Sequence, residues 1–276
     1  MLEHARLLFL REKAVHIRKL ILRMIFNADS GHVGGSLSAV EILVTLYYQA
    51  MKHNAKNPDW PQRDRFVMSK GHGAPALYAV LADCGYFPEK DLDDFRRLGG
   101  HLQGHPSHNK TPGVEATTGS LGQGLSIACG MALGAKLRGD RQNYYVLCGD
   151  GEIQEGQIWE AALFAAGRRL DNLIAFVDRN RYQQNGETES IVPLHPLAPK
   201  WEAFGWDVRE IDGHDFPSII KAITHAQSVT GKPSMIVAHT TKGKGVSFME
   251  NKPGWHGKSL NAGELDAAFK ELEHGL

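Results

Sequence analysis

The chain lacks the excess of one charge and the long apolar runs that mark several classes of protein. Of its 276 residues, 31 are Lys or Arg and 31 are Asp or Glu, so the formal net charge is zero. Without an excess of positive charge we expect neither nucleic acid nor a membrane surface as a partner. The first 19 residues mix charged with apolar side chains. They form neither the apolar core of a signal peptide nor a membrane span, so we expect a cytoplasmic protein.

Cysteines and several familiar motifs are also scarce or missing. Cys84, Cys129 and Cys148 are scattered, with no CxxC pair, as is typical of small buried hydrophobes in a reduced compartment. No GxGxxG follows a first strand and no GxxxxGK[ST] occurs, which disfavours a dinucleotide-binding Rossmann domain and a P-loop NTPase. The histidines show no HExxH or paired ligand spacing, so a zinc hydrolase is disfavoured.

The sequence does contain short apolar runs that alternate with segments of helical periodicity. Strands are expected at 65–69, 144–148, 173–177, 207–211 and 235–239. Helices are expected at 4–27, 74–84, 125–137, 153–167 and 216–229, and from Ser38, with Glu41 as its capping-box partner, to about Met51. This order predicts an α/β fold, a parallel sheet flanked by helices. No linker divides it, so we expect one domain over 1–276, with 1–30 as an N-terminal helical extension.

Two polar residues follow the two apolar runs at 144–148 and 173–177. Asp150 lies in Gly149-Asp150-Gly151, and Asn180 follows after 28 intervening residues. A right-handed βαβ unit places the carboxyl ends of both strands side by side, so the two side chains should converge. A carboxylate and an amide oxygen beside glycine backbone suit a hard cation that also holds phosphate oxygens. Taken singly, Asp150 is equally compatible with a helix N-cap and Asn180 with a turn.

Five loops contain glycine, and all but 119–124 also carry histidine or lysine. They cover 30–35, 69–73, 104–106, 119–124 and 242–245, the last extending to 255–257. Glycine lets backbone N–H groups approach anionic oxygens, and a neutral imidazole donates one hydrogen bond without a full charge. Together these loops indicate a pocket for a polar, phosphorylated ligand. Singly, Gly-His-Gly is typical of a turn, and Lys242 and Lys244 are typical of solvated loop charges.

At this point the motifs resemble a known family. Gly149-Asp150-Gly151-Glu152 followed by Asn180 resembles the thiamine diphosphate signature, and the flanking loops look like transketolase, in order, from about residue 16 to 258. The resemblance covers only the diphosphate-binding domain. It implies the N-terminal subunit of a split transketolase, because the sequences at 30–36 and 241–250 look more like those of split subunits than those of full-length enzymes. The alternative is that the chain is a piece of a longer protein.

The resemblance implies thiamine diphosphate and Mg²⁺ (or Ca²⁺) as cofactors, with transfer of a two-carbon ketol unit from a ketose phosphate to an aldose phosphate. The implied metal ligands are Asp150, the Asn180 side chain and the carbonyl of Tyr182. The implied cofactor contacts are His72, Gly119, Leu121, Gly151, Glu160, Asn180 and His256. The implied catalytic residues are His32, His105, His256 and Glu155.

Some of these positions leave alternatives open. Glu155 and Glu160 resemble an acidic pair that bonds across the interface between active sites, but they also fit an ordinary polar helix face. Tyr182 stands where the family usually has an aliphatic residue, which a carbonyl ligand tolerates. The run Gln183-Gln184-Asn185-Gly186 replaces the usual Gln-x-Asp-Gly, so the sugar remains open.

The implied partners are a second polypeptide with the pyrimidine-binding and C-terminal domains, sugar phosphates, and a second copy of the chain in an α2β2 assembly. Because the glutamate that activates the cofactor comes from the second polypeptide, we expect the chain alone to be inactive and to bind the cofactor weakly. The alternatives are a transketolase for a specialised sugar, 1-deoxyxylulose-5-phosphate synthase, and an alpha-type chain of a 2-oxo-acid dehydrogenase. A non-catalytic binding or regulatory role is a further alternative, against which the retained Asp150, Asn180, Glu155 and four loop histidines argue.

Overall fold

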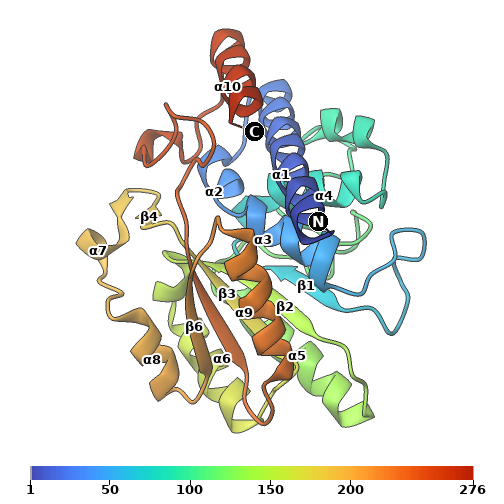
Figure 1. Cartoon of the computed structure of the whole chain (residues 1–276), viewed down its shortest axis with the longest axis vertical. Coiled ribbons are helices and arrows are strands. Elements are labelled where there is room, and N and C mark those ends of the chain that lie inside the picture. The colour runs from blue at the N-terminus through green and yellow to red at the C-terminus, as the bar shows by residue number, and fades with distance from the viewer. Residues whose placement is uncertain (1, 276) are drawn as a thin grey trace.

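Five parallel strands form the centre of residues 2–275, the part of the chain that the computed structural model describes (Figure 1). In spatial order they are β1 (Arg65–Met68), β2 (Tyr144–Gly149), β3 (Leu173–Arg179), β7 (Ser234–His239) and β6 (Asp207–Asp212). Every neighbouring pair runs parallel. The predicted α/β fold and its five strands are therefore confirmed.

The burial of each strand explains its composition. All residues of β2 and β3 are buried, because both faces of the sheet are covered, and their sequences are accordingly continuous apolar runs. Alternate side chains enter two separate cores: Tyr145 and Leu147 face one, whereas Val146 and Cys148 face the other. The edge strand β6 exposes several of its residues.

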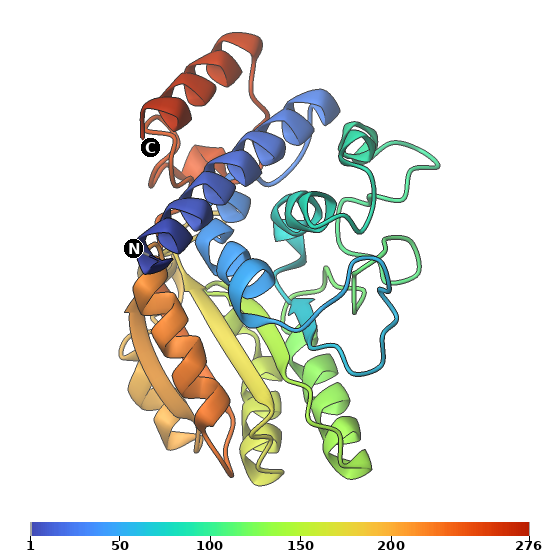
Figure 2. The same cartoon turned by 45° about the vertical axis from the view of Figure 1, so that its right-hand side comes forward.

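Helices cover both faces of the sheet (Figure 2). The larger core includes residues of α1 (Leu2–Ala28), α2 (Val33–Leu37), α3 (Val40–Thr45), α4 (Ala74–Asp83), α9 (Phe216–Ser228) and α10 (Ala262–His274). The smaller core includes residues of α5 (Gln123–Arg138), α6 (Gly156–Gly167) and α8 (Leu197–Ala203). In Figure 2 the green helices α5 and α6 lie on one side of the sheet and the orange α9 on the other.

The remaining elements are short and occur in the segments that connect the longer helices and strands. They are a π-helical turn at Leu46–Ala50, α7 (Thr188–Ile191), the antiparallel strands β4 (Tyr182–Gln183) and β5 (Gly186–Glu187), and 3₁₀ turns at Gly71–Gly73, Glu89–Asp94, Glu152–Gln154 and Pro253–Trp255. The apolar stripe of α1 belongs to the larger core, where Leu10, Ile17 and Ile21 have no exposed surface. None of the described helices combines the length and apolarity that crossing a bilayer requires.

Two helix starts differ from the sequence prediction. Ser38 is not a helix N-cap: it follows α2, and its hydroxyl donates to Asp178 Oδ2 at 2.7 Å, with Gly35 O next nearest at 3.2 Å. Glu41 is no capping-box partner either, because its carboxylate is buried against Arg18 at 2.8 Å. Helix α6 begins at Gly156 rather than at 153, because a 3₁₀ turn and an extended Glu155 precede it.

Candidate active site

Asp150 and Asn180 lie next to each other at the carboxyl end of the sheet, as their spacing predicts. Strands β2 and β3 pair with Gly149 opposite Asp178, so each polar residue begins the loop that follows its strand. Both side chains line one cavity of about 240 Å³. The predicted site residues that share this cavity are His72, Leu121, Asp150, Gly151, Glu155, Asn180, Tyr182 and His256.

The carboxylate of Asp150 is held by three donors. Its Oδ1 accepts from the N–H of Gly151 at 2.7 Å, and its Oδ2 accepts from the N–H of Arg181 and from Arg179 Nη1 at 3.2 Å. Burial and the nearby charge of Asp178 raise the pKa of Asp150 to about 6, against the opposing effect of Arg179. A cation in the cavity would favour the ionised form of this carboxylate.

Asn180 and Tyr182 add two neutral oxygens. Asn180 Nδ2 donates to Asp178 Oδ2 at 3.1 Å, which identifies Oδ1 as the oxygen that accepts from the N–H of Tyr182 at 3.1 Å. The carbonyl of Tyr182 lies 3.5 Å from Lys242 Nζ. No cluster of three His, Cys, Asp or Glu side chains suited to a metal occurs within residues 2–275. One carboxylate with amide and carbonyl oxygens is instead the donor set of a hard cation such as Mg²⁺ or Ca²⁺, and these residues fit it.

Four imidazoles form a cluster beside the cavity. The ring centroid of His32 lies 5.4 Å from those of His72 and His256 and 6.1 Å from that of His105. Burial, followed by Lys242, lowers the pKa of His256 to about 3. Burial and then Arg96 lower the pKa of His32 to about 4, and burial holds that of His72 well below its usual value. These three rings are therefore neutral at pH 7 and act as hydrogen-bond partners.

The tautomer and the unmet hydrogen bonds of this cluster are informative. Lys242 Nζ lies 2.8 Å from His256 Nδ1, so Nδ1 accepts and the ring proton sits on Nε2. His32 Nδ1 is buried without a hydrogen-bond partner among the described residues. Buried polar atoms are normally paired, so we expect a bound ligand to supply the hydrogen-bond partner of His32 Nδ1.

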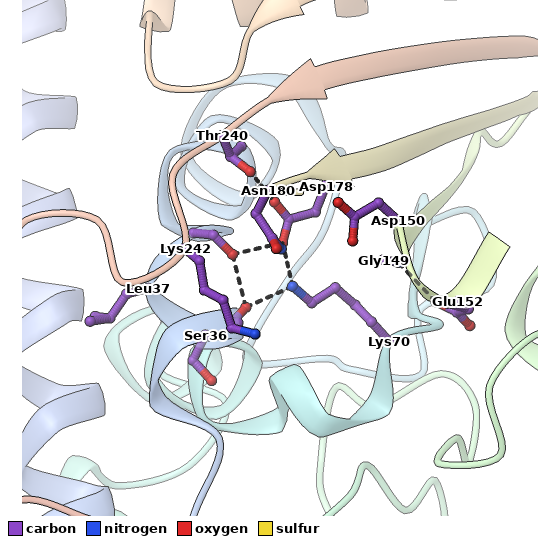
Figure 3. Close-up of polar contacts among 12 residues, drawn as sticks. Ser36, Leu37, Lys70, Gly149, Asp150, Glu152, Asp178, Asn180, Thr240 and Lys242 are labelled. Carbon is purple, nitrogen blue, oxygen red and sulfur yellow. Dashed lines mark hydrogen bonds and ion pairs between the residues drawn. The ribbon is translucent and has the colours of Figure 1, made fainter. Parts of the chain in front are cut away.

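Two lysines at the site are buried, which the sequence interpretation did not anticipate. The alternative that Lys242 is a solvated loop charge does not hold: it is 1% exposed, and burial together with the charge of Lys70 lowers its pKa to about 8. Lys70 is also 1% exposed and donates to Asp178 and to Gly35 O at 2.7 Å (Figure 3). Lys242 follows β7 by three residues, a strand-end position that could have marked it.

Glu152 joins the loops around the cavity and was likewise missed as a structural residue. Its buried carboxylate accepts from the N–H groups of Gly122 and Gly149, both at 2.9 Å, and from Ser69 Oγ at 2.5 Å. Three loops distant in sequence are thus tied to one side chain. A Cβ at Gly151 would lie 2.9 Å from Gln183 Cβ, so this glycine is required by the close approach of the hairpin.

The remaining predicted residues lie at the edge of the site or outside it. A Cβ on Gly119 would lie 3.3 Å from the ring of His105, so the two share the histidine side of the site. His105 is exposed, and Glu155 is exposed at the N-cap of α6 on the cavity wall. Glu160 lies on the exposed face of α6 and does not line the cavity.

Oxygen donors, buried cations and neutral imidazoles gathered at the carboxyl ends of a parallel sheet define an α/β domain suited to a cation and a phosphorylated ligand. The family model described as "Transketolase, thiamine diphosphate binding domain" matches residues 10–275. The chain belongs to the transketolase family.

Relatives of two lengths resemble the chain. It is 52% identical to the 6-deoxy-6-sulfo-D-fructose transketolase subunit SqwG of Clostridium sp. (strain MSTE9), and 45% identical to an apulose-4-phosphate transketolase subunit of Actinobacillus succinogenes. Each alignment covers 96% of this chain and 96% of the relative. The transketolase structure from Leishmania mexicana matches with a TM-score of 0.91 and 35% identity, covering 96% of this chain but only 41% of that one.

Proposed function

We propose that this chain is one subunit of a thiamine diphosphate-dependent transketolase that moves a two-carbon ketol unit from a ketose phosphate to an aldose phosphate. The observation that carries the proposal is the single cavity shared by Asp150, Asn180, Tyr182 and the neutral imidazole of His256. Such a transfer needs oxygen ligands for a cation next to uncharged groups that hydrogen-bond to sugar hydroxyls.

The residues of the chain divide the work in this proposal. Asp150, Asn180 and the Tyr182 carbonyl hold Mg²⁺ (or Ca²⁺), which in turn holds the diphosphate. His72, His256 and the Gly151 backbone contact the diphosphate itself, and Lys242 lies behind them, 2.8 Å from His256 Nδ1. Bound thiamine diphosphate supplies a carbanion for carbon–carbon cleavage.

The imidazole cluster beside the cavity is the side for the substrate, and His72 and His256 line the cavity itself. His32, His105 and His256 bond the sugar hydroxyls and move protons at their ring nitrogens. Because burial holds the pKa values of His32 and His256 low, both rings are neutral at pH 7, and each can donate from one nitrogen and accept at the other. Gly119 and Leu121 meet the organic part of the cofactor, and Glu155 and Glu160 face a neighbouring chain.

The proposal includes a second polypeptide. Similar proteins of this length are named as transketolase subunits, and the transketolase structure that matches is more than twice as long. We therefore expect pyrimidine-binding and C-terminal domains on a partner, in an α2β2 assembly. Leu121, on the cavity wall, is 38% exposed and would meet the partner or the cofactor there.

The test is to purify the chain with and without the transketolase-like polypeptide encoded in the same genome. With Mg²⁺, thiamine diphosphate, xylulose 5-phosphate and ribose 5-phosphate, the pair should turn over and the chain alone should not. Asp150→Asn should abolish activity of the pair, whereas Asp140→Asn, at an exposed ion pair with Arg138, should not. Robust turnover by the chain alone, or full activity of Asp150→Asn, would contradict the proposal.

A second candidate differs only in the donor sugar. The 52% identity to a protein named as a 6-deoxy-6-sulfo-D-fructose transketolase subunit favours a sulfonated ketose. A donor panel of 6-deoxy-6-sulfofructose, fructose 6-phosphate and xylulose 5-phosphate decides between the two by kcat/KM. A tenfold or greater preference for the sulfosugar would select the second candidate.

A further inference from the structure

Arg179, the last residue of β3, has a guanidinium group enclosed by three acceptors. Its Nη1 donates to Asp150 Oδ2 at 3.2 Å and to Thr188 Oγ1 at 2.7 Å, and its Nη2 donates to the carboxylate of Glu189. The Arg179 side chain is only 8% exposed. Arginine is rarely buried without partners, and its planar fork holds several acceptors in one arrangement.

The partners of Arg179 include two residues of the loop 181–195, which forms one wall of the cavity. Glu189 also accepts from the N–H groups of Leu194 and His195, both at 3.3 Å. Across the base of the loop, the N–H of Thr188 donates to Arg181 O at 2.9 Å. The hairpin of β4 and β5 lies within this loop and brings Tyr182 and Gln183 to the cavity.

The two carboxylate oxygens of Asp150 accept different numbers of hydrogen bonds in this network. Oδ2 receives both Arg179 and the N–H of Arg181, whereas the one donor to Oδ1 within residues 2–275 is the N–H of Gly151. A carboxylate with one oxygen fixed by two donors cannot rotate without breaking both. The same guanidinium thus sets the orientation of the expected metal ligand and the position of the loop that supplies the Tyr182 carbonyl.

We propose that Arg179 is a positioning residue that latches the 181–195 loop onto the cavity and orients Asp150 for a divalent cation. The loop half of this inference stands on contacts within the chain alone. The cation half rests on the proposed function. Removing Arg179 should therefore loosen the loop in the cofactor-free chain and weaken cation binding in the assembled protein.

The loop half is tested by hydrogen–deuterium exchange on the cofactor-free chain. In Arg179→Met, amides of 188–195 should exchange at least tenfold faster, while those of β2 and β3 remain protected. Glu189→Gln should raise exchange in the same segment. The matched control is Arg181→Met, two residues along, whose exposed side chain lies outside the network. Unchanged exchange at 188–195 in Arg179→Met would overturn the latch.

The cation half is tested by calorimetry with Mn²⁺ and thiamine diphosphate, with the partner polypeptide present. Arg179→Met should bind Mn²⁺ at least tenfold more weakly, Arg179→Lys should recover part of the loss, and Arg181→Met should match wild type. Wild-type affinity in a folded Arg179→Met would refute the orienting role. If Arg179→Met does not fold by far-UV circular dichroism, Arg179→Lys and Glu189→Gln carry both tests, with intermediate losses expected. Absence of metal-dependent binding in wild type would overturn the proposed function and the cation half, and the exchange experiment would still decide the loop half.

Discussion

Replacing Lys70 with Met should destabilise the cofactor-free protein by about 3 kcal/mol. The Lys70 ammonium and the Asp178 carboxylate are almost wholly buried, and removing one partner of a buried pair costs about 3–5 kcal/mol because the other charge stays behind. Asp178 would keep the donors Ser38 Oγ, Thr240 Oγ1 and Asn180 Nδ2, so we expect the lower end of that range.

The control is Lys136→Met. Lys136 pairs with Asp171 at 2.7 Å, but the two side chains are 39% and 31% exposed. An exposed pair contributes about 0–1 kcal/mol. Lys136→Met should therefore cost about 2 kcal/mol less than Lys70→Met, which is the difference between the lower end of the buried range and the upper end of the exposed range.

The assay is urea unfolding followed by circular dichroism and tryptophan fluorescence on wild type, Lys70→Met, Asp178→Asn and the double variant. The sum of the two single losses should exceed the double loss, with a coupling energy of about 1–3 kcal/mol. Equal costs for Lys70→Met and Lys136→Met, or strictly additive single losses, would refute the reasoning.

The same pair makes a pH prediction. Burial alone would raise the pKa of Asp178, but Lys70 and the hydroxyl donors hold it below its usual value. A depressed carboxyl pKa contributes stability above the unfolded value of about 3.9, and that contribution disappears as the pH falls through the folded pKa. Without Lys70 this pKa should rise, so acid unfolding of Lys70→Met should begin at a higher pH than that of wild type.

Three further changes test other features of the site and the core. Lys242→Met should stabilise the cofactor-free protein at pH 7 by about 3 kcal/mol, because the fall of the Lys242 pKa on folding from about 10.4 to about 8 reports a disfavoured charge. Between the folded pKa of about 8 and the unfolded value of about 10.4, the unfolded chain binds more protons than the folded chain. Lys242 therefore makes the free energy of unfolding of the wild type rise with pH across that window. Urea titrations of Lys242→Met should show a flatter rise. Gly151→Ala should weaken thiamine diphosphate binding at least tenfold by calorimetry while the protein stays folded, because its Cβ would meet Gln183 Cβ at 2.9 Å; unchanged affinity would contradict this. Trp201→Ala should cost about 3–5 kcal/mol in urea unfolding, since Trp201 is wholly buried in the smaller core, and a loss below about 1 kcal/mol would contradict that packing.

The sheet was predictable because its strands have a strong and simple sequence signal. Continuous apolar runs such as 144–148 and 173–177 are stable only where both faces are covered, and β2 and β3 are buried throughout. Parallel pairing then determines which residues follow the strand ends. The adjacency of Asp150 and Asn180 needed no further information than this topology.

What escaped prediction depends on partners far away in the sequence. Ser38 and Glu41 satisfy the local pattern of a capping box. In the fold, Ser38 bonds Asp178, 140 residues away, and Glu41 bonds His214, 173 residues away. Long-range partners that bury a charge outweigh a local cap, and the local pattern contains no sign of them. The β4–β5 hairpin was missed for a related reason: its two-residue strands are too short to show periodicity.

The charges around the cavity show why its ligand should be an anion. Lys70 is neutralised by Asp178, but Lys242 forms no ion pair with a carboxylate among residues 2–275; its contacts are His256 Nδ1 and the carbonyls of Tyr182 and Gln183. A buried ammonium without a counter-ion lowers the stability of the empty protein. An anion in the cavity, next to its partner His256, would supply a counter-charge for Lys242. We therefore expect the stability lost at Lys242 in the empty chain to be recovered when a diphosphate binds. Lys242→Met should raise the stability of the empty chain while lowering its affinity for the diphosphate.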